Sequence, residues 1–367
     1  MTTRATATRS RSSMLQHLLI CIPGGTYAAI AIWTGLVLCS AITSAATLPT
    51  VDEVLQELQL SDSDKERIRD GKIVDWTATE GSDRELALGM AFLVKVKPED
   101  LFEIYREAMV LKEVSVITAH GRITGEGAMA DLAGVKLQPN AEKEARRYLT
   151  VKPGDELNLD AKEMAAFQAL QAANQGEAVP VQKVETLVRQ GLLARYQAYR
   201  RNGLTGIAPY ERGSGDQRSA GDELRLSTHQ LTGVAKHLPA FHKFLLNYPN
   251  GMTKEEAKNL EESFYWLNID VFGRPTYVLV HRMLYHVGDA ALAVERQYYA
   301  SHDYNSMLQG IAALPTKDGT FLFYIGRVST DQVAGFMSSA KHPVSRAITA
   351  PYIKDMFKSF QAKVTKQ

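Results

Sequence analysis

The last third of the chain contains four strand-like runs separated by very short turns, and this pattern constrains the fold more than any other feature. The runs cover 276–287, 292–300, 304–314 and 320–328, with turn residues at 288–289 and 317–319. Strands joined by turns this short run antiparallel. The sequence therefore predicts an antiparallel meander.

Residues on either side of this meander complete an α+β pattern. A hairpin is predicted over 72–79 and 86–96, followed by a helix that Pro98 opens and a strand over 115–124. After the meander, Pro343 opens a final helix, which Pro351 is expected to kink or split. Its apolar stripe comprises Ile348, Tyr352, Ile353, Met356, Phe357, Phe360 and Val364. We expect an antiparallel curved sheet that grips this C-terminal helix.

Between the first strands and the meander, the chain has the composition of a largely helical insertion at about 140–270. Good helix formers dominate from 141 to about 201, where an apolar stripe runs from Val184 to Tyr196. Three further segments are predicted: an exposed loop over 202–215 and helices near 222–236 and 254–268.

Residues 1–46 form a leader with basic, apolar and small-residue parts in that order. Three arginines within the first 11 residues carry its only charges, and none occurs over 12–51. This order is typical of a secretory signal peptide, which would leave a mature chain beginning near Thr47. The alternative is an uncleaved membrane anchor, since residues 28–46 are about long enough to span a bilayer. Either way the body is expected outside the cytoplasm, periplasmic or secreted.

Charge and cysteine content argue against several classes of function. Subtracting the three leader arginines from 42 basic residues leaves 39 against 41 acidic residues, a net charge of −2. A body without a dense basic run offers no surface for nucleic acid. Cys21 and Cys39 both lie in the leader, so its cleavage would remove every thiol.

Motifs for metals, cofactors and nucleophiles are missing from the sequence. The histidine pairs 237/242 and 281/286 are each five residues apart, a spacing that disfavours a metal clamp on one element. No phosphate-binding glycine loop or nucleophile elbow occurs. We therefore expect no metal and no cofactor.

Polar side chains on the first two strands of the meander are candidate ligand-binding residues. Alternation places Tyr277 and His281 on one face of the first strand, and Arg296 and Tyr298 on one face of the second. If buried, such groups need partners, and they would anchor the head group of an apolar ligand. The alternative is that both faces meet solvent, where these side chains need no partner.

His302 and Arg327 complete the candidate set. His302 precedes Asp303 in the turn to the third strand, and this pair could tune a general base or simply cap the turn. Arg327 ends the fourth strand, where it is either a ligand anchor or a surface charge.

The order of elements resembles the helix-grip fold of the START-like superfamily. The resemblance rests on a hairpin, a short helix opened by Val96-Lys-Pro-Glu-Asp-Leu-Phe102, and a meander closing on a C-terminal helix. It covers about residues 70–130 and 273–365, with the helical middle as an insertion. In that family a curved sheet grips a long helix around an apolar cavity that carries lipids, sterols or polyketides, and only some members are enzymes.

These observations predict an exported protein that binds or carries a hydrophobic small molecule or lipid without catalysis. One alternative is an enzyme acting on an apolar substrate in the cell envelope, with His302, Asp303 and Arg296 as its polar groups. Another is an envelope interaction protein whose aromatic segment Phe241–Tyr248 touches a partner or a membrane surface.

Overall fold

The computed structural model describes residues 48–106, 116–154, 156–174, 178–271, 273–335 and 337–364. The predicted signal peptide or anchor falls outside these ranges, so its processing stays a prediction. Among the described residues, every helix is too short or too polar to cross a bilayer.

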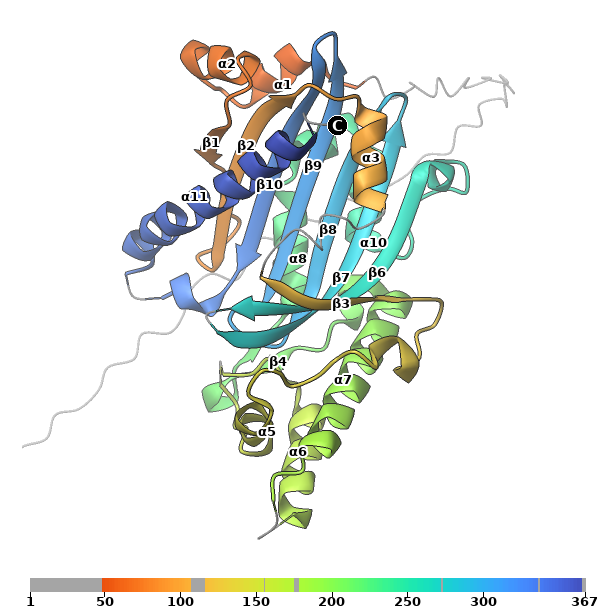
Figure 1. Cartoon of the computed structure of the whole chain (residues 1–367), viewed down its shortest axis with the longest axis vertical. Helices are drawn as coiled ribbons and strands as arrows, with labels where there is room; N and C mark the ends of the chain where they lie inside the picture. The colour runs from red at the N-terminus through yellow and green to blue at the C-terminus, as the bar shows by residue number, and fades with distance from the viewer. Residues whose placement is uncertain are drawn as a thin grey trace, which may run out of the picture. The chain divides into compact units, whose positions relative to one another are not determined.

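An eight-stranded antiparallel sheet is the centre of the fold (Figure 1). Its spatial order is β1 (Val74–Thr77), β2 (Glu85–Val94), β10 (Gly319–Ser329), β9 (Ser306–Thr316), β8 (Ala290–Ala300), β7 (Arg274–Val287), β6 (Leu260–Val271) and β3 (Ile117–Ile123). The predicted meander is confirmed as β7 to β10, and the predicted N-terminal hairpin as β1 and β2.

One side of the sheet, called the front face, packs against two helices, α3 (Pro98–Arg106) and α11 (Ser338–Val364) (Figure 1). Phe357 of α11 lies on Phe92 of β2 and Tyr324 of β10, with ring centroids 5.0 Å apart in both pairs. The front face is therefore covered by the C-terminal helix. This confirms the predicted fold class, an α+β sheet with a C-terminal helix across it.

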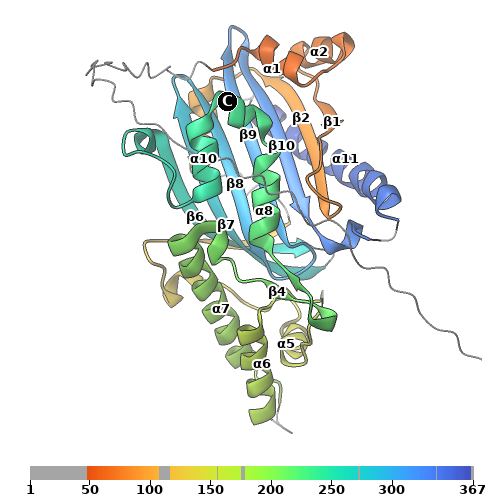
Figure 2. The same cartoon turned by 180° about the vertical axis from the view of Figure 1, so that it is seen from behind.

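The opposite side of the sheet, called the back face, is covered by part of the helical middle of the chain. The helices of this segment are α5 (Ala141–Leu149), α6 (Ala161–Ala173), α7 (Val181–Asn202), α8 (Ala220–His229), α9 (Thr232–His237) and α10 (Pro239–Asn247). Of these, α8 and α10 lie across the strands, whereas α5, α6 and most of α7 extend beyond one end of the sheet (Figure 2). Two N-terminal helices, α1 (Val51–Glu57) and α2 (Asp62–Arg69), pack against β1, β2 and β10. The sheet is thus the middle layer of three.

The prediction for the C-terminal helix is partly wrong. α11 runs as one helix through Pro343 and Pro351, and both prolines lie on its exposed side, where water can satisfy the carbonyl groups they free. Ile348 is 72% exposed and Tyr352 is 54% exposed, so these two residues do not belong to the buried stripe. Phe357 is buried there as predicted.

The helix predicted near 254–268 is also wrong, because that segment forms a short 3-10 turn, Glu256–Asn259, followed by strand β6. Four successive large residues, Phe264 to Leu267, are all buried, as expected for a strand covered on both sides. The helical insertion therefore ends before residue 260.

The segment 202–215 was expected to be an exposed loop, but part of it is interior. Tyr210 begins the two-residue strand β4 (Tyr210–Glu211), which pairs with β5 (Gln217–Arg218). Its ring is fully buried, and its hydroxyl donates to the carbonyl oxygen of Asn305 at 2.9 Å. This loop therefore helps to fasten the insertion to the sheet.

Candidate ligand-binding site

A cavity of about 200 Å³, called the front cavity, lies between the front face, α3 and α11. Its apolar lining comprises Leu101, Phe102, Ile104, Leu284, Ala291, Ala293, Ile311, Ala313, Leu322, Met356, Phe357 and Phe360. Alanines on the central strands β8 and β9 stand where larger side chains would fill the space. The cavity therefore exists because small residues of the sheet face large residues of the helices.

A row of polar side chains, called the polar band, crosses the sheet at one end of this cavity. Arg282, Glu295 and Gln309 are direct cross-strand neighbours on β7, β8 and β9. Gln309 Nε2 donates to Glu295 Oε1 at 2.9 Å, and the hydroxyl of Tyr324 donates to Gln309 Oε1 at 3.0 Å. The cavity thus combines an apolar body with one polar end, as in small-molecule sites generally.

Arg282 is the one cation of the polar band, and it is 3% exposed. Its guanidinium carbon lies 3.9 Å from the centre of the Tyr105 ring, and its Nε lies 3.5 Å from Glu295 Oε2. That Nε–H has no hydrogen-bond partner among the described residues. Burial alone would lower the pKa of Arg282, but Tyr105 and Glu295 raise it above the ordinary value. The polar band therefore presents to the cavity the guanidinium of Arg282, a hydrogen-bond donor whose charge is balanced by Glu295.

The predicted residues Tyr277, His281, Arg296 and Tyr298 all lie on the back face, beneath the insertion helices, and none of them lines the front cavity. All four are at most 1% exposed, so the alternative of solvent-facing side chains is wrong. The hydroxyl of Tyr277 donates to the carbonyl oxygen of Lys136 at 2.7 Å. The rings of Tyr298 and Tyr199 stack with centroids 4.0 Å apart.

His281 and Arg296 are joined through Tyr199 of α7. Arg296 Nη1 donates to the Tyr199 hydroxyl at 3.0 Å, and that hydroxyl donates to His281 Nδ1 at 2.9 Å. The other ring nitrogen of His281 lies 2.8 Å from Glu262. Burial lowers the pKa of His281 to about 4, with Glu262 opposing the shift. Protein groups thus occupy both ring nitrogens of His281, whereas Nε of Arg296 and the hydroxyl of Tyr298 are buried without a hydrogen-bond partner among the described residues.

His302 and Arg327 occupy two different places. His302 is 1% exposed, pairs with Asp303, and bonds the carbonyl oxygen of Pro275 at 3.0 Å, which is the geometry of a turn cap. Arg327 pairs with Glu85 at 3.0 Å and is the one member of the predicted set that lines a described cavity. That cavity lies on the back face.

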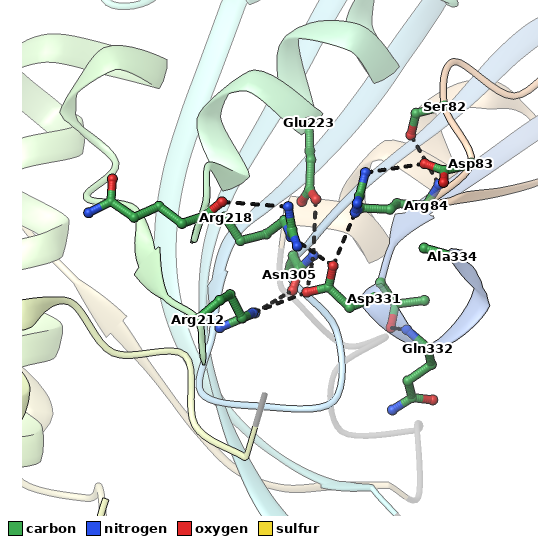
Figure 3. Close-up of polar contacts among 12 residues, drawn as sticks. Ser82, Asp83, Arg84, Arg212, Arg218, Glu223, Asn305, Asp331, Gln332 and Ala334 are labelled. Atoms are coloured by element: carbon green, nitrogen blue, oxygen red, sulfur yellow. Dashed lines mark hydrogen bonds and ion pairs between the residues drawn. The ribbon is translucent and has the colours of Figure 1, made fainter. Parts of the chain in front are cut away.

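A separate cluster of charged side chains, half-buried except for the buried Arg212, joins the insertion to the segment that follows β10 (Figure 3). Asp331, after β10, forms ion pairs of 3.1, 3.1 and 2.7 Å with Arg84, Arg212 and Arg218. Although burial acts to raise it, Arg218 and Arg212 hold the pKa of Asp331 below its ordinary value. No described cavity reaches Asp331. We interpret the cluster as structural.

Sequence reasoning missed Tyr105, Arg282, Glu295 and Gln309 as functional candidates. Alternation does place Arg282 opposite to His281 on β7, but it does not say which face borders a cavity. The available signal was the run of alanines and glycine at 290–293 and 310–313, where central strands lack bulk on both faces.

Comparison of the chain with protein-family models, characterised proteins and solved structures finds no match.

Proposed function

We propose that this protein is exported and binds or carries a small hydrophobic molecule or lipid in the front cavity. The observation that carries the proposal is an apolar cavity between the sheet and α11 with the polar band at one end. A ligand with an apolar body and one polar group matches it. The volume of about 200 Å³ is below the usual range of pockets for drug-sized ligands, which favours a compact ligand.

The resemblance to the START-like superfamily supports the same proposal. The described elements follow the expected order, from a hairpin and α3 to a meander that ends in α11. The front cavity lies where the resemblance implies a ligand, between the curved sheet and its C-terminal helix.

The two alternatives receive less support from the described residues. His302, Asp303 and Arg296 bond to protein groups and line neither described cavity. In the segment Phe241–Tyr248, all three aromatic rings are at most 4% exposed. Those rings form core and do not offer a surface to a membrane or partner.

Native mass spectrometry of the purified protein tests the proposal, because it reveals a retained ligand without a guess at its identity. We expect an adduct that detaches on collisional activation. Ala313→Leu adds bulk inside the front cavity and should remove the adduct, whereas Ile348→Ala on the exposed side of α11 should retain it. A protein without any adduct, or an Ala313→Leu protein that keeps it, would count against the proposal.

A further inference from the structure

A second and larger cavity, called the back cleft, lies on the other side of the same strands. Its volume is about 670 Å³, within the usual range of ligand pockets. Its walls are α1, the end of β1 and the segment 230–238, which follows α8 and contains α9. The elements α1, β1 and α8 border the back face in Figure 2. Glu57 of α1 bonds His237 of α9 at 2.9 Å and also pairs with Lys236, so an ion-pair cluster joins the two walls.

The floor of the back cleft is long, apolar and polar only at one end. Phe323, Ile325 and Arg327 succeed one another on the back face of β10. The four-residue step from Phe323 to Arg327 spans about 13 Å along the strand. Leu314 and Ala312 of β9 line the cleft beside Phe323. The cleft therefore fits a narrow, extended molecule better than a compact one.

Small residues on β9 leave this floor open. Ala312 faces the back cleft, while its neighbour Ala313 faces the front cavity. A side chain added at Gly310 would first meet Ile325 Cγ2 at 3.5 Å, an ordinary contact distance. Packing against neighbours therefore does not require glycine there, and the missing side chains contribute open volume.

Arg327 supplies the polar end of the back cleft. It is 3% exposed, and its Nη1 donates to Glu85 Oε2 at 3.0 Å and to the carbonyl oxygen of Thr79 at 2.8 Å. Its buried Nε–H has no hydrogen-bond partner among the described residues. Because Glu85 already neutralises Arg327, a second carboxylate there would be repelled, whereas a neutral oxygen could accept the free hydrogen bond.

We propose that the back cleft binds a single-chain amphiphile whose end group is a neutral oxygen acceptor, such as a long-chain alcohol or ester. The oxygen accepts from Arg327, and the hydrocarbon chain lies along β9 and β10 toward Phe323. This site is separate from the front cavity and does not depend on the function proposed for it.

Trp76 gives this proposal a direct readout. Its ring stacks on Phe323 with centroids 5.4 Å apart and lines the back cleft, whereas neither Trp76 nor Trp266, the two tryptophans that the structure describes, lines the front cavity. A ligand whose oxygen is bound at Arg327 would place the far end of its hydrocarbon chain near Trp76. The probe is 12-bromo-1-dodecanol, because bromine quenches tryptophan fluorescence at contact. Trp76→Phe is the control that removes the reporter.

We expect the bromoalcohol to quench the tryptophan fluorescence of the full-length protein in a saturable way. This saturable quenching should be lost in the Trp76→Phe protein. Ala312→Leu, which adds bulk to the floor of the back cleft, should weaken the apparent affinity by about tenfold or more, whereas Ala313→Leu should change it by less than about twofold. Thermal melts establish that both variants fold. Because the two substitutions are adjacent and chemically identical, a difference between their apparent affinities shows on which face of the sheet the ligand binds.

The end group is tested on the unaltered protein with 1-bromododecane and 12-bromododecanoate. The alcohol should bind about tenfold more tightly than the bromoalkane, which cannot accept a hydrogen bond, and more tightly than the carboxylate. Quenching that does not saturate, equal effects of Ala312→Leu and Ala313→Leu, or tightest binding of the carboxylate would each overturn the proposal.

Discussion

Replacing Glu223 by glutamine should change how the stability of this protein depends on pH. Glu223 projects from α8 toward the Asp331 cluster (Figure 3), where it accepts from Asn305 Nδ2 at 3.0 Å and from Ser306 Oγ at 3.4 Å. Burial, with a smaller effect from Asp331, raises the pKa of Glu223 from 4.5 to about 7. Glutamine resembles the protonated acid, and its side-chain oxygen can still accept from Asn305.

The direction in which the free energy of unfolding changes with pH follows from proton binding. Because the pKa of Glu223 is higher in the folded than in the unfolded chain, the folded protein binds more protons between pH 4.5 and 7. Its free energy of unfolding therefore falls as pH rises through that window. A shift of this size corresponds to about 3 kcal/mol. The Glu223→Gln protein should match the unaltered protein near pH 4 and exceed its free energy of unfolding by about 3 kcal/mol at pH 8.

His281 acts in the opposite direction over nearly the same range. Its pKa is lowered to about 4 by burial, so the folded protein loses stability as pH falls from 6.5 toward 4. In the unaltered protein the two slopes offset each other. Removing the contribution of Glu223 by Glu223→Gln should therefore make the free energy of unfolding fall more steeply as pH is lowered.

Urea unfolding at pH 4 to 8, followed by tryptophan fluorescence, measures the free energy of unfolding of the unaltered and the Glu223→Gln protein as a function of pH. Asp222→Asn, at the exposed neighbour of Glu223 on α8, is the control and should change stability by no more than about 0.5 kcal/mol. A difference between Glu223→Gln and the unaltered protein that stays constant with pH would refute the reasoning, as would a less stable variant at pH 8.

Three further predictions concern stability and export. Arg296→Ala leaves the Tyr199 hydroxyl and the carbonyl of Leu245 without their buried donor, so the free energy of unfolding should fall by about 2–5 kcal/mol in urea titrations; an unchanged midpoint would contradict this. Deleting residues 352–367 removes buried Phe357 from the sheet and should unfold or aggregate the protein, whereas an unchanged thermal midpoint would show α11 to be dispensable. Mass analysis of the exported protein should find its first residue close to Thr47, and a membrane-bound product that retains Met1 would support the anchor instead.

The sequence predicted those elements whose signals are local. Pro98 marks the start of α3, and short turns define the antiparallel meander. The segment 254–268 was predicted to form a helix, but most of it forms β6, which pairs with both β3 and β7. Local propensity yields to tertiary pairing in such cases.

The candidate site was harder to predict, because alternation does not say what covers each face of a sheet. It also assumes regular strands, whereas β8 shifts register at Tyr298: Leu279 pairs with Tyr299, and Val280 pairs with Gln297. As a result Tyr298 and Tyr299 both join the back-face core. Arg282 borders the front cavity, and His281 does not, because α3 and α11 cover the front face, and both helices are far from β7 in the sequence.

The pairing of β2 with β10 has a consequence for the order of folding. Phe92 lies opposite Leu322, 230 residues later in the chain, so β2 lacks this neighbour until almost the whole polypeptide is available. The strands β6 to β10 pair with their sequence neighbours and can assemble first, since closing short loops costs little entropy. We therefore expect late closure of the sheet, with β2 docking onto a preformed meander. A chain that emerges gradually from its N-terminus could form the hairpin of β1 and β2 early, but the other edge of β2 would stay unpaired until β10 arrives.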